Sequence, residues 1–176
     1  PYLPAFEVLI PGLVETYDRS DRDPLLQGPI EVLRNWDYAV AKESVAMSLA
    51  HFYGVACQNA GTPTEMKFMQ MIAYWAENAP DIEKLALLKK AVARLIADFG
   101  TWDTPWGEIN RYQRIDGAIQ QAFDDQQPSI PIGMAPGNWG ALAAYGARYH
   151  NNTKKIYGTR GNSFVAVVEF GEKLKA

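Results

Sequence analysis

Residues 80–100 read PDIEKLALLKKAVARLIADFG, and this stretch is the clearest secondary-structure signal in the chain. Apolar side chains recur along it every three or four residues, which is the spacing of one face of an α-helix. Gly100 follows the last apolar position, and glycine commonly ends a helix. The stretch predicts a long amphipathic helix with a stripe formed by Ile82, Leu85, Leu88, Val92, Leu95 and Phe99.

The helical pattern extends back to residue 29. In GPIEVLRNWD (28–37), Gly28 and Pro29 supply a helix start. AKESVAMSLAHFYGVACQNA (41–60) has apolar residues at helical spacing, and GTPTEMKFMQMIAYWA (61–76) has Thr64 as its expected N-cap. Residues 29–100 are therefore predicted to form a helical region.

Both flanks of this region have a different composition. The first 28 residues contain prolines at positions 1, 4, 11 and 24, so we expect residues 1–28 to form an extended proline-rich arm. Residues 101–176 begin with an aromatic and loop-rich segment, which includes DDQQPSIPIGMAPGNWG (124–140), and lead into a β-strand at Ser163–Phe170. The predicted fold class is mainly α with a small β component, without an independent second domain.

The strand at Ser163–Phe170 needs hydrogen-bonding partners, because a lone strand is not stable. The candidates within the chain are two weak strand patterns, KKIYG (154–158) and FEVLI (6–10). The other possibility is that its neighbours lie beyond Ala176. We favour this second possibility and expect the chain to be a fragment of a larger protein.

Composition excludes several classes of function. The formal net charge is −3, so the chain has no basic excess that would favour nucleic acid as a partner. No apolar run reaches the length of a membrane span. Cys57 lies among apolar residues, where a buried thiol is expected, and neither His51 nor His150 has a second ligand at metal-binding spacing. We therefore expect no metal and no cofactor.

A few residues are candidates for chemistry, and each has a simpler structural explanation. Ser48 and His51 have a spacing that allows contact on a helix, but no third group or oxyanion donor accompanies them. The acidic residues that could form a carboxylate pair or a cation site are Asp116, Asp124 and Asp125. Their spacing does not match an EF-hand loop, and adjacent acidic residues in a proline-rich loop are usually only solvated.

Two further candidates lie at the ends of the chain. Ser163 lacks the frame of a nucleophile elbow, and Pro1 could act as a base only as a mature N-terminus within a pocket. The residues by themselves specify no reaction, and we assign no catalytic, substrate-binding or metal-binding residue.

Three segments together resemble one enzyme family. GPIEVLRNWD (28–37) ends in the pattern Leu-x-x-Trp-Asp, TPWGEINRYQR (104–114) contains a Trp-Gly pair, and IYGTRGNSFVAVVEFGEK (156–173) carries the strand. In this order they resemble the β subunit of the penicillin acylase (penicillin amidase) family, nearest the aculeacin and acyl-homoserine lactone acylase branch. The chain departs from many relatives at Val165, where they have arginine, and lacks their Ser-Gly-Asn-Pro-type segment.

The resemblance implies an N-terminal nucleophile hydrolase with an αββα core, cut from a precursor into α and β subunits. A serine at the new β-subunit terminus would attack the amide of an N-acylated small molecule of the β-lactam, lipopeptide or acyl-homoserine lactone type. It also implies a periplasmic or secreted parent. This chain begins with Pro1, so we expect an interior piece of the β subunit that is inactive alone.

The partners implied are the rest of the β subunit, the α subunit and the N-acyl substrate of the parent; we also expect the isolated piece to self-associate. Two alternatives remain open. The chain could be a non-catalytic helical binding module with a groove rimmed by Trp102, Trp106 and Trp139. It could also be a self-sufficient enzyme that uses Pro1 or the Ser48–His51 pair.

Overall fold

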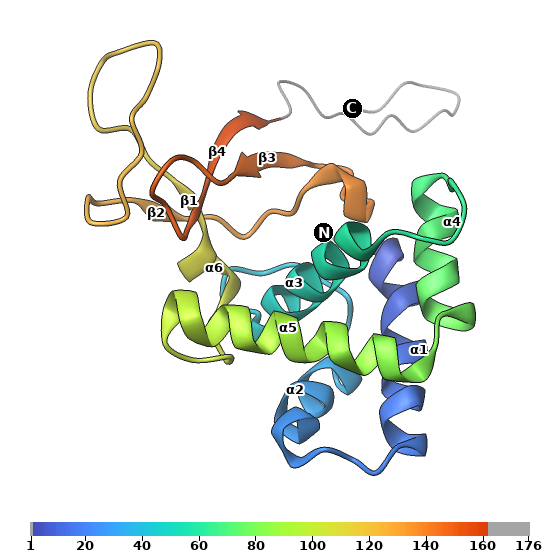
Figure 1. Cartoon of the computed structure of the whole chain (residues 1–176). Helices are drawn as coiled ribbons and strands as arrows, with labels where there is room; N and C mark the ends of the chain where they lie inside the picture. Colours follow the sequence, from blue (N-terminus) through green and yellow to red (C-terminus); the bar gives the residue numbers. More distant parts are fainter. Residues whose placement is uncertain (1, 162–176) are drawn as a thin grey trace, which may run out of the picture.

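The computed structural model describes residues 2–161, and within them the chain is mostly helical with one small sheet. Figure 1 shows the helices packed together on one side of the molecule and the strands on the other. The fold class predicted from the sequence, mainly α with a small β component, is confirmed. The helical elements are α1 (Pro4–Arg19), α2 (Pro24–Arg34), α3 (Val45–Ala60), α4 (Phe68–Ala73), a π-helical turn (Tyr74–Asn78), α5 (Asp81–Phe99) and α6 (Trp106–Ile109).

The prediction of an extended arm over residues 1–28 is wrong, because α1 and the start of α2 occupy most of it. Pro4 lies in the first turn of α1, where a backbone N–H has no partner within the helix. Pro11 removes one internal hydrogen bond, which costs about 3 kcal/mol in a helix interior. One face of the helix compensates by burying Phe6, Leu9, Ile10, Leu13, Val14 and Tyr17. Each such side chain contributes about 1.5–3 kcal/mol on full burial.

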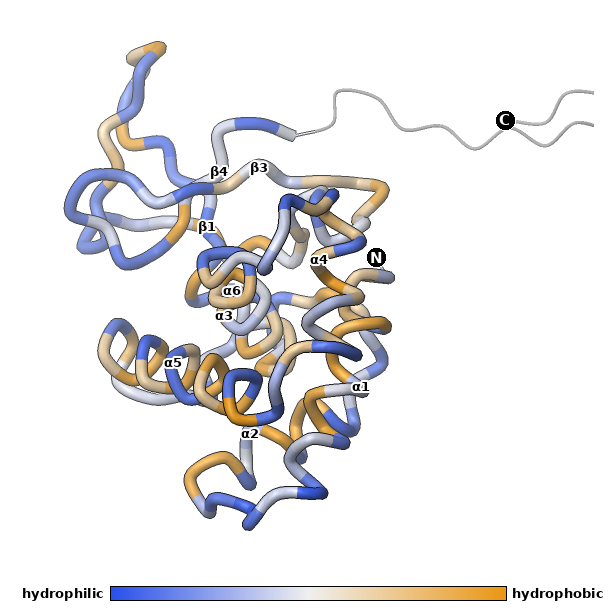
Figure 2. Tube along the Cα trace, turned by 45° about the vertical axis from the view of Figure 1, so that its right-hand side comes forward, coloured by the Kyte–Doolittle hydropathy of each residue, from blue (hydrophilic) through white to orange (hydrophobic). Residues whose placement is uncertain are grey.

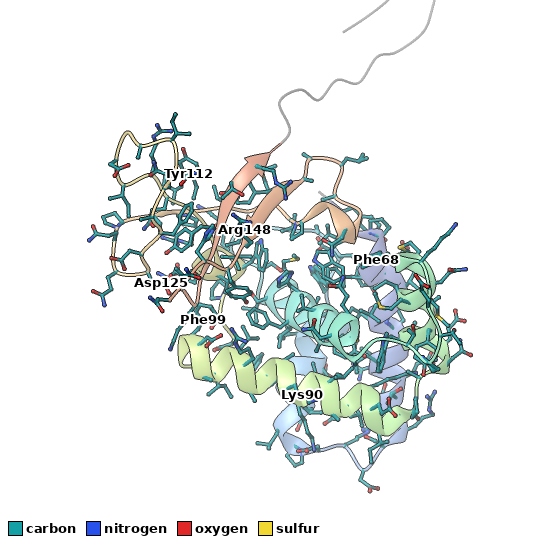
Figure 3. The ribbon with its side chains drawn as sticks, turned by 45° about the horizontal axis from the view of Figure 1, so that its top comes forward. Phe68, Lys90, Phe99, Tyr112, Asp125 and Arg148 are labelled. Atoms are coloured by element: carbon teal, nitrogen blue, oxygen red, sulfur yellow. The ribbon has the colours of Figure 1, made fainter. Side chains whose placement is uncertain are left out.

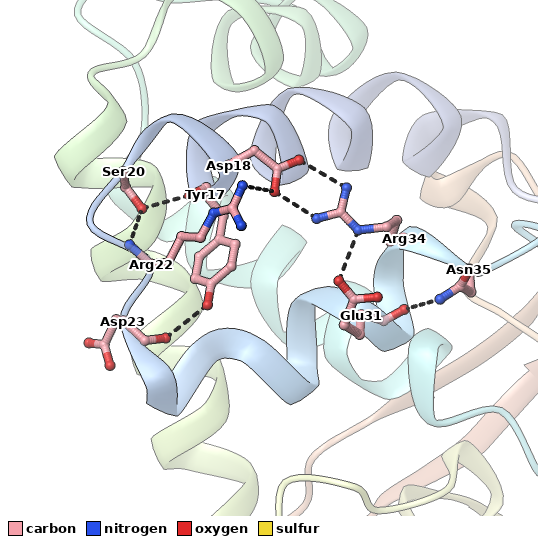
Figure 4. A network of polar contacts seen from close by, with 8 residues as sticks. All are labelled: Tyr17, Asp18, Ser20, Arg22, Asp23, Glu31, Arg34 and Asn35. Atoms are coloured by element: carbon pink, nitrogen blue, oxygen red, sulfur yellow. Dashed lines mark hydrogen bonds and ion pairs between the residues drawn. The ribbon is translucent and has the colours of Figure 1, made fainter.

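Helix α2 also begins earlier than predicted. Its N-cap is Asp23, whose carboxylate accepts a hydrogen bond of 2.9 Å from the backbone N–H of Leu25, and Pro29 lies inside the helix. Figure 4 shows how α2 is tied to α1, with the Arg34 guanidinium donating to both carboxylate oxygens of Asp18 at 2.8 and 2.9 Å. These groups are partly exposed, so the pair mainly fixes the orientation of the two helices.

The predictions for the later helices hold, with corrections at their ends. Helix α5 spans the predicted stretch, and Gly100 caps it in the left-handed conformation with a φ of 88°. Ile82 does not belong to its buried stripe, since it is 79% exposed. Helix α4 begins at Phe68 with Lys67 as its N-cap, so Thr64 does not start it.

The strands form one four-stranded mixed sheet in the order β2-β1-β4-β3. Strand β4 pairs in parallel with β1 and antiparallel with β3, and β1 pairs antiparallel with β2. The weak pattern at residues 154–158 is thus part of a real strand, whereas residues 6–10 are helical. The strand predicted at Ser163–Phe170 lies outside the described residues. The strand bounds are β1 Asn110–Tyr112, β2 Ile130–Pro131, β3 Tyr145–Arg148 and β4 Ile156–Gly161.

Two tryptophans join the sheet side of the molecule to the helices. Trp139, in a short 3₁₀ turn (Gly137–Trp139), is fully buried against the rings of Phe6 and Phe68, with centroid distances of 4.6 and 5.7 Å. Trp106 is also fully buried, and its indole N–H donates to the carbonyl of Met134 at 2.8 Å. Figure 2 shows hydrophobic residues concentrated among the helices and mostly hydrophilic residues in the loop between β1 and β2.

Candidate functional site

The Ser48–His51 pair lies on α3, but its contacts are not those of a nucleophile and its base. Nδ1 of His51 accepts a hydrogen bond of 3.1 Å from the indole N–H of Trp139, and the imidazole packs 4.9 Å from the ring of Trp106. Oγ of Ser48 is buried and has no hydrogen-bond partner among the described residues, His51 included. The histidine therefore connects α3 to the 3₁₀ turn and does not activate the serine.

Burial determines the protonation of His51. The side chain is 8% exposed, and loss of hydration lowers its pKa from 6.5 to about 4. The ring is consequently neutral near pH 7, which agrees with its role as a hydrogen-bond acceptor for Trp139.

A pH-dependent loss of stability follows from this lowered pKa. The unfolded chain binds a proton at His51 below about pH 6.5, whereas the folded chain does so only near pH 4. The stabilisation is therefore complete above pH 6.5 and is lost as the pH falls toward 4, by about 2 kcal/mol between pH 7 and pH 5. In denaturant titrations at several pH values, His51→Asn should remove most of this dependence of the free energy of unfolding on pH. The side-chain carbonyl of the asparagine can still accept from Trp139, but it does not titrate.

The control for this measurement is His150→Asn. Burial also lowers the pKa of His150, so each variant retains one of the two titrating histidines. If the free energy of unfolding depended on pH equally in the parent and in His51→Asn, His51 would not be held neutral by burial.

Cys57 is a core residue. It is fully buried, and burial raises the pKa of its thiol to about 12. Because the thiolate is the nucleophilic form, this cysteine is inert at neutral pH. The prediction of a buried thiol is confirmed.

The three aspartates shape the loop between β1 and β2 and the start of β4. Asp125 accepts from the hydroxyl of Tyr157 at 2.9 Å and from the backbone N–H of Lys154 at 2.6 Å. Asp116 and Asp124 each accept from a backbone N–H two residues further along, at 2.9 Å. Within residues 2–161, no three acidic, histidine or cysteine side chains are grouped so that they could hold a metal ion.

The groove expected between Trp102, Trp106 and Trp139 does not form, because Trp106 and Trp139 are fully buried. Trp102 lines a separate apolar cavity of about 490 Å³ between α2 and α5, together with exposed Leu25 and Ile96. In the described part of the chain, no helix is both long enough and apolar enough to span a membrane.

A cavity at the sheet was not anticipated by the sequence analysis, which had considered only His150 among its lining residues. It has a volume of about 730 Å³ and is bounded by β3, β4 and the loop that follows β1. Arg114, Arg148 and Arg160 line it, together with His150 and aromatic side chains. No sequence pattern joins these three arginines, because their convergence depends on strand order.

The segments at residues 28–37 and 104–114, which carry the resemblance, lie at α2 and at α6 with β1. A comparison with sequence models of protein families matches residues 1–176, the whole chain, to penicillin amidase. The chain belongs to the penicillin amidase family. No curated protein matches it significantly.

Family membership confirms the resemblance inferred from the three segments, and it implies a parent of the N-terminal nucleophile hydrolase class. The branch within the penicillin amidase family and the position within a β subunit stay predictions. Pro1, Ser163 and Val165 lie outside the described residues, so their predicted roles are untested.

Proposed function

We propose that this penicillin amidase family chain is a scaffold portion of an amidohydrolase. The parent would add water across the amide bond of an N-acylated small molecule and release a carboxylic acid and an amine. β-Lactams, lipopeptides and acyl-homoserine lactones are the substrate types that we propose. The main support for a scaffold role is the hydrogen bond that Trp139 donates to His51. His51 is the candidate base on α3, and this bond occupies its Nδ1 atom in the core.

The partners of this portion would be the α subunit and the rest of a β subunit, in a periplasmic or secreted enzyme. Several large apolar side chains support such partners, since they are strongly exposed on residues 2–161. Ile119 is 101% and Leu142 90% exposed. Apolar surface of this kind is typical of regions that another chain covers, and it would promote self-association of the isolated chain.

The decisive experiment measures amide hydrolysis with p-nitroanilides of phenylacetic acid and of fatty acids. We expect the assembled enzyme to release p-nitroaniline and the 176-residue chain alone to stay at the buffer rate. The same assay on the assembled enzyme carrying His51→Asn should give a rate within about twofold of the parent. We expect this because Trp139 already engages His51 in the core, so that in the proposed scaffold role His51 would touch no substrate.

Circular dichroism at pH 7 must first show that the His51→Asn enzyme is folded. Hydrolysis by the isolated chain that disappears in His51→Asn would overturn the scaffold role and return catalysis to α3. If the assembled enzyme cleaved none of these amides, the proposed reaction would be overturned.

A further inference from the structure

The cavity of about 730 Å³ at the sheet is strongly cationic. Arg114 follows β1, Arg148 ends β3 and Arg160 lies in β4, so the strand order β1-β4-β3 brings the three arginines to one cavity. No aspartate or glutamate of the described residues lines it. Figure 3 shows Arg148 on the strands and Tyr112, another lining residue, toward the neighbouring loop.

These three arginines differ from all the others in the chain. The other arginines each form an ion pair with an aspartate or glutamate: Arg19, Arg22, Arg34, Arg94 and Arg111. Arg114, Arg148 and Arg160 have no acidic partner within residues 2–161. Three like charges around one cavity repel each other, and an anion bound between them would relieve that repulsion.

A second observation at the same cavity points to a ligand. Nε2 of His150 is buried and has no hydrogen-bond partner among residues 2–161. Buried polar atoms are nearly always hydrogen-bonded, so an orphan atom in the wall of a cavity calls for an explanation. A carboxylate oxygen could accept from the protonated Nε2.

The cavity also has a flat aromatic wall. The imidazole of His150 lies 4.1 Å from the ring of Phe123, centroid to centroid, and Phe123 stacks on Tyr157 at 5.1 Å. Tyr145 lines the same space, and its hydroxyl donates to the carbonyl of Arg111 at 3.0 Å, which fixes its ring. Aromatic rings held in this way can pack against a planar ligand.

From this geometry we propose that the cavity binds a small organic carboxylate with a flat aromatic body. The guanidinium groups of Arg148 and Arg160 would hold the carboxylate, since arginine matches its planar, two-oxygen geometry. His150 and Phe123 would contact the ring. A volume of about 730 Å³ lies in the usual range for small-molecule sites. This site does not depend on the proposed amide hydrolysis.

Benzoate is the test ligand. Benzamide is the control, because it has nearly the same shape but no charge. Calorimetric titration of the 176-residue chain should show benzoate binding at least tenfold more tightly than benzamide, and weakening as salt is added. Inorganic phosphate, which has the charge without the ring, should compete with benzoate only at higher concentration. Arg148→Gln and Arg160→Gln should each weaken benzoate binding about tenfold. Arg22→Gln, on an exposed arginine at the α1–α2 connection, should leave it unchanged.

Proton NMR supplies an independent readout, because the chain has only two histidines. Burial lowers the pKa of His150, a hydrogen bond with the backbone of Tyr157 partly offsets this, and the charge of Arg148 lowers it further. A bound carboxylate should raise the pKa of His150 and leave the signal of His51, buried in the helical core, unchanged.

Three results would overturn the proposed site, and a fourth would overturn the proposed ligand. They are equal affinity for benzoate and benzamide, the same affinity in Arg148→Gln as in Arg22→Gln, and no binding of benzoate. Phosphate binding as tightly as benzoate would reject the organic ligand. The substituted arginines are exposed, so all variants should fold, and circular dichroism checks this.

Discussion

Trp139→Ala is expected to lower the free energy of unfolding by about 3–5 kcal/mol, the range for truncating a large buried aromatic residue. The indole is fully buried and touches the rings of Phe6 and Phe68, so its loss leaves a cavity between the sheet side and the helices. The substitution also removes the donor to Nδ1 of His51. Chemical denaturation monitored by circular dichroism measures the change.

Trp102→Ala is the matched control, since it removes the same side chain from a half-buried position at the rim of the cavity between α2 and α5. Its effect should be less than half that of Trp139→Ala. A loss at Trp139 no larger than that at Trp102 would contradict the central place of Trp139 in the core.

Gly12→Ala is expected to destabilise the protein by about 1–3 kcal/mol, although alanine normally strengthens a helix by up to about 1 kcal/mol over glycine. A Cβ at position 12 would lie 2.2 Å from the backbone carbonyl oxygen of Ala76. That oxygen also accepts from the buried ammonium of Lys84 at 2.9 Å, so moving it disturbs a second contact. The sign of the change therefore reports how closely α1 approaches the π-helical turn.

Gly117→Ala serves as the comparison, because a Cβ there meets no atom within 4 Å. Thermal unfolding should show a midpoint for Gly117→Ala close to that of the parent and a clearly lower midpoint for Gly12→Ala. A stabilised Gly12→Ala protein would mean that α1 is not packed against Ala76.

Long helices were predictable where the determining interactions are local. Residues 80–100 contain all the local signals of a helix: apolar residues at helical spacing, acidic residues in the first turn and a glycine at the C-terminal end. Helix α5 forms there as predicted. Residues 1–28 carry contrary local signals, because their prolines favour an extended chain. The same segment also carries apolar residues at helical spacing, Phe6, Leu9, Ile10, Leu13, Val14 and Tyr17, and the prolines concealed this signal. The packing of that apolar face against α2 and the π-helical turn decides in favour of the helix.

The candidate site residues show the same contrast between local signals and long-range contacts. The sequence placed Ser48 and His51 on one helix, but the hydrogen bond that gives His51 its role comes from Trp139, which lies far along the chain. The cationic cavity was missed because Arg114, Arg148 and Arg160 occupy three separate segments. Only the parallel pairing of β4 with β1 and its antiparallel pairing with β3 make them neighbours.

By itself the sequence determined the helical class, the extent of α5 and the penicillin amidase family, because helical periodicity and family motifs are read within short segments. Tertiary structure decided that Pro11 is accommodated inside a helix, that His51 is a buried acceptor, and that three arginines without an acidic partner in residues 2–161 share one cavity. These outcomes depend on contacts between residues far apart in the chain. Their free energy comes from burial and strand pairing in the folded protein, which local patterns do not encode.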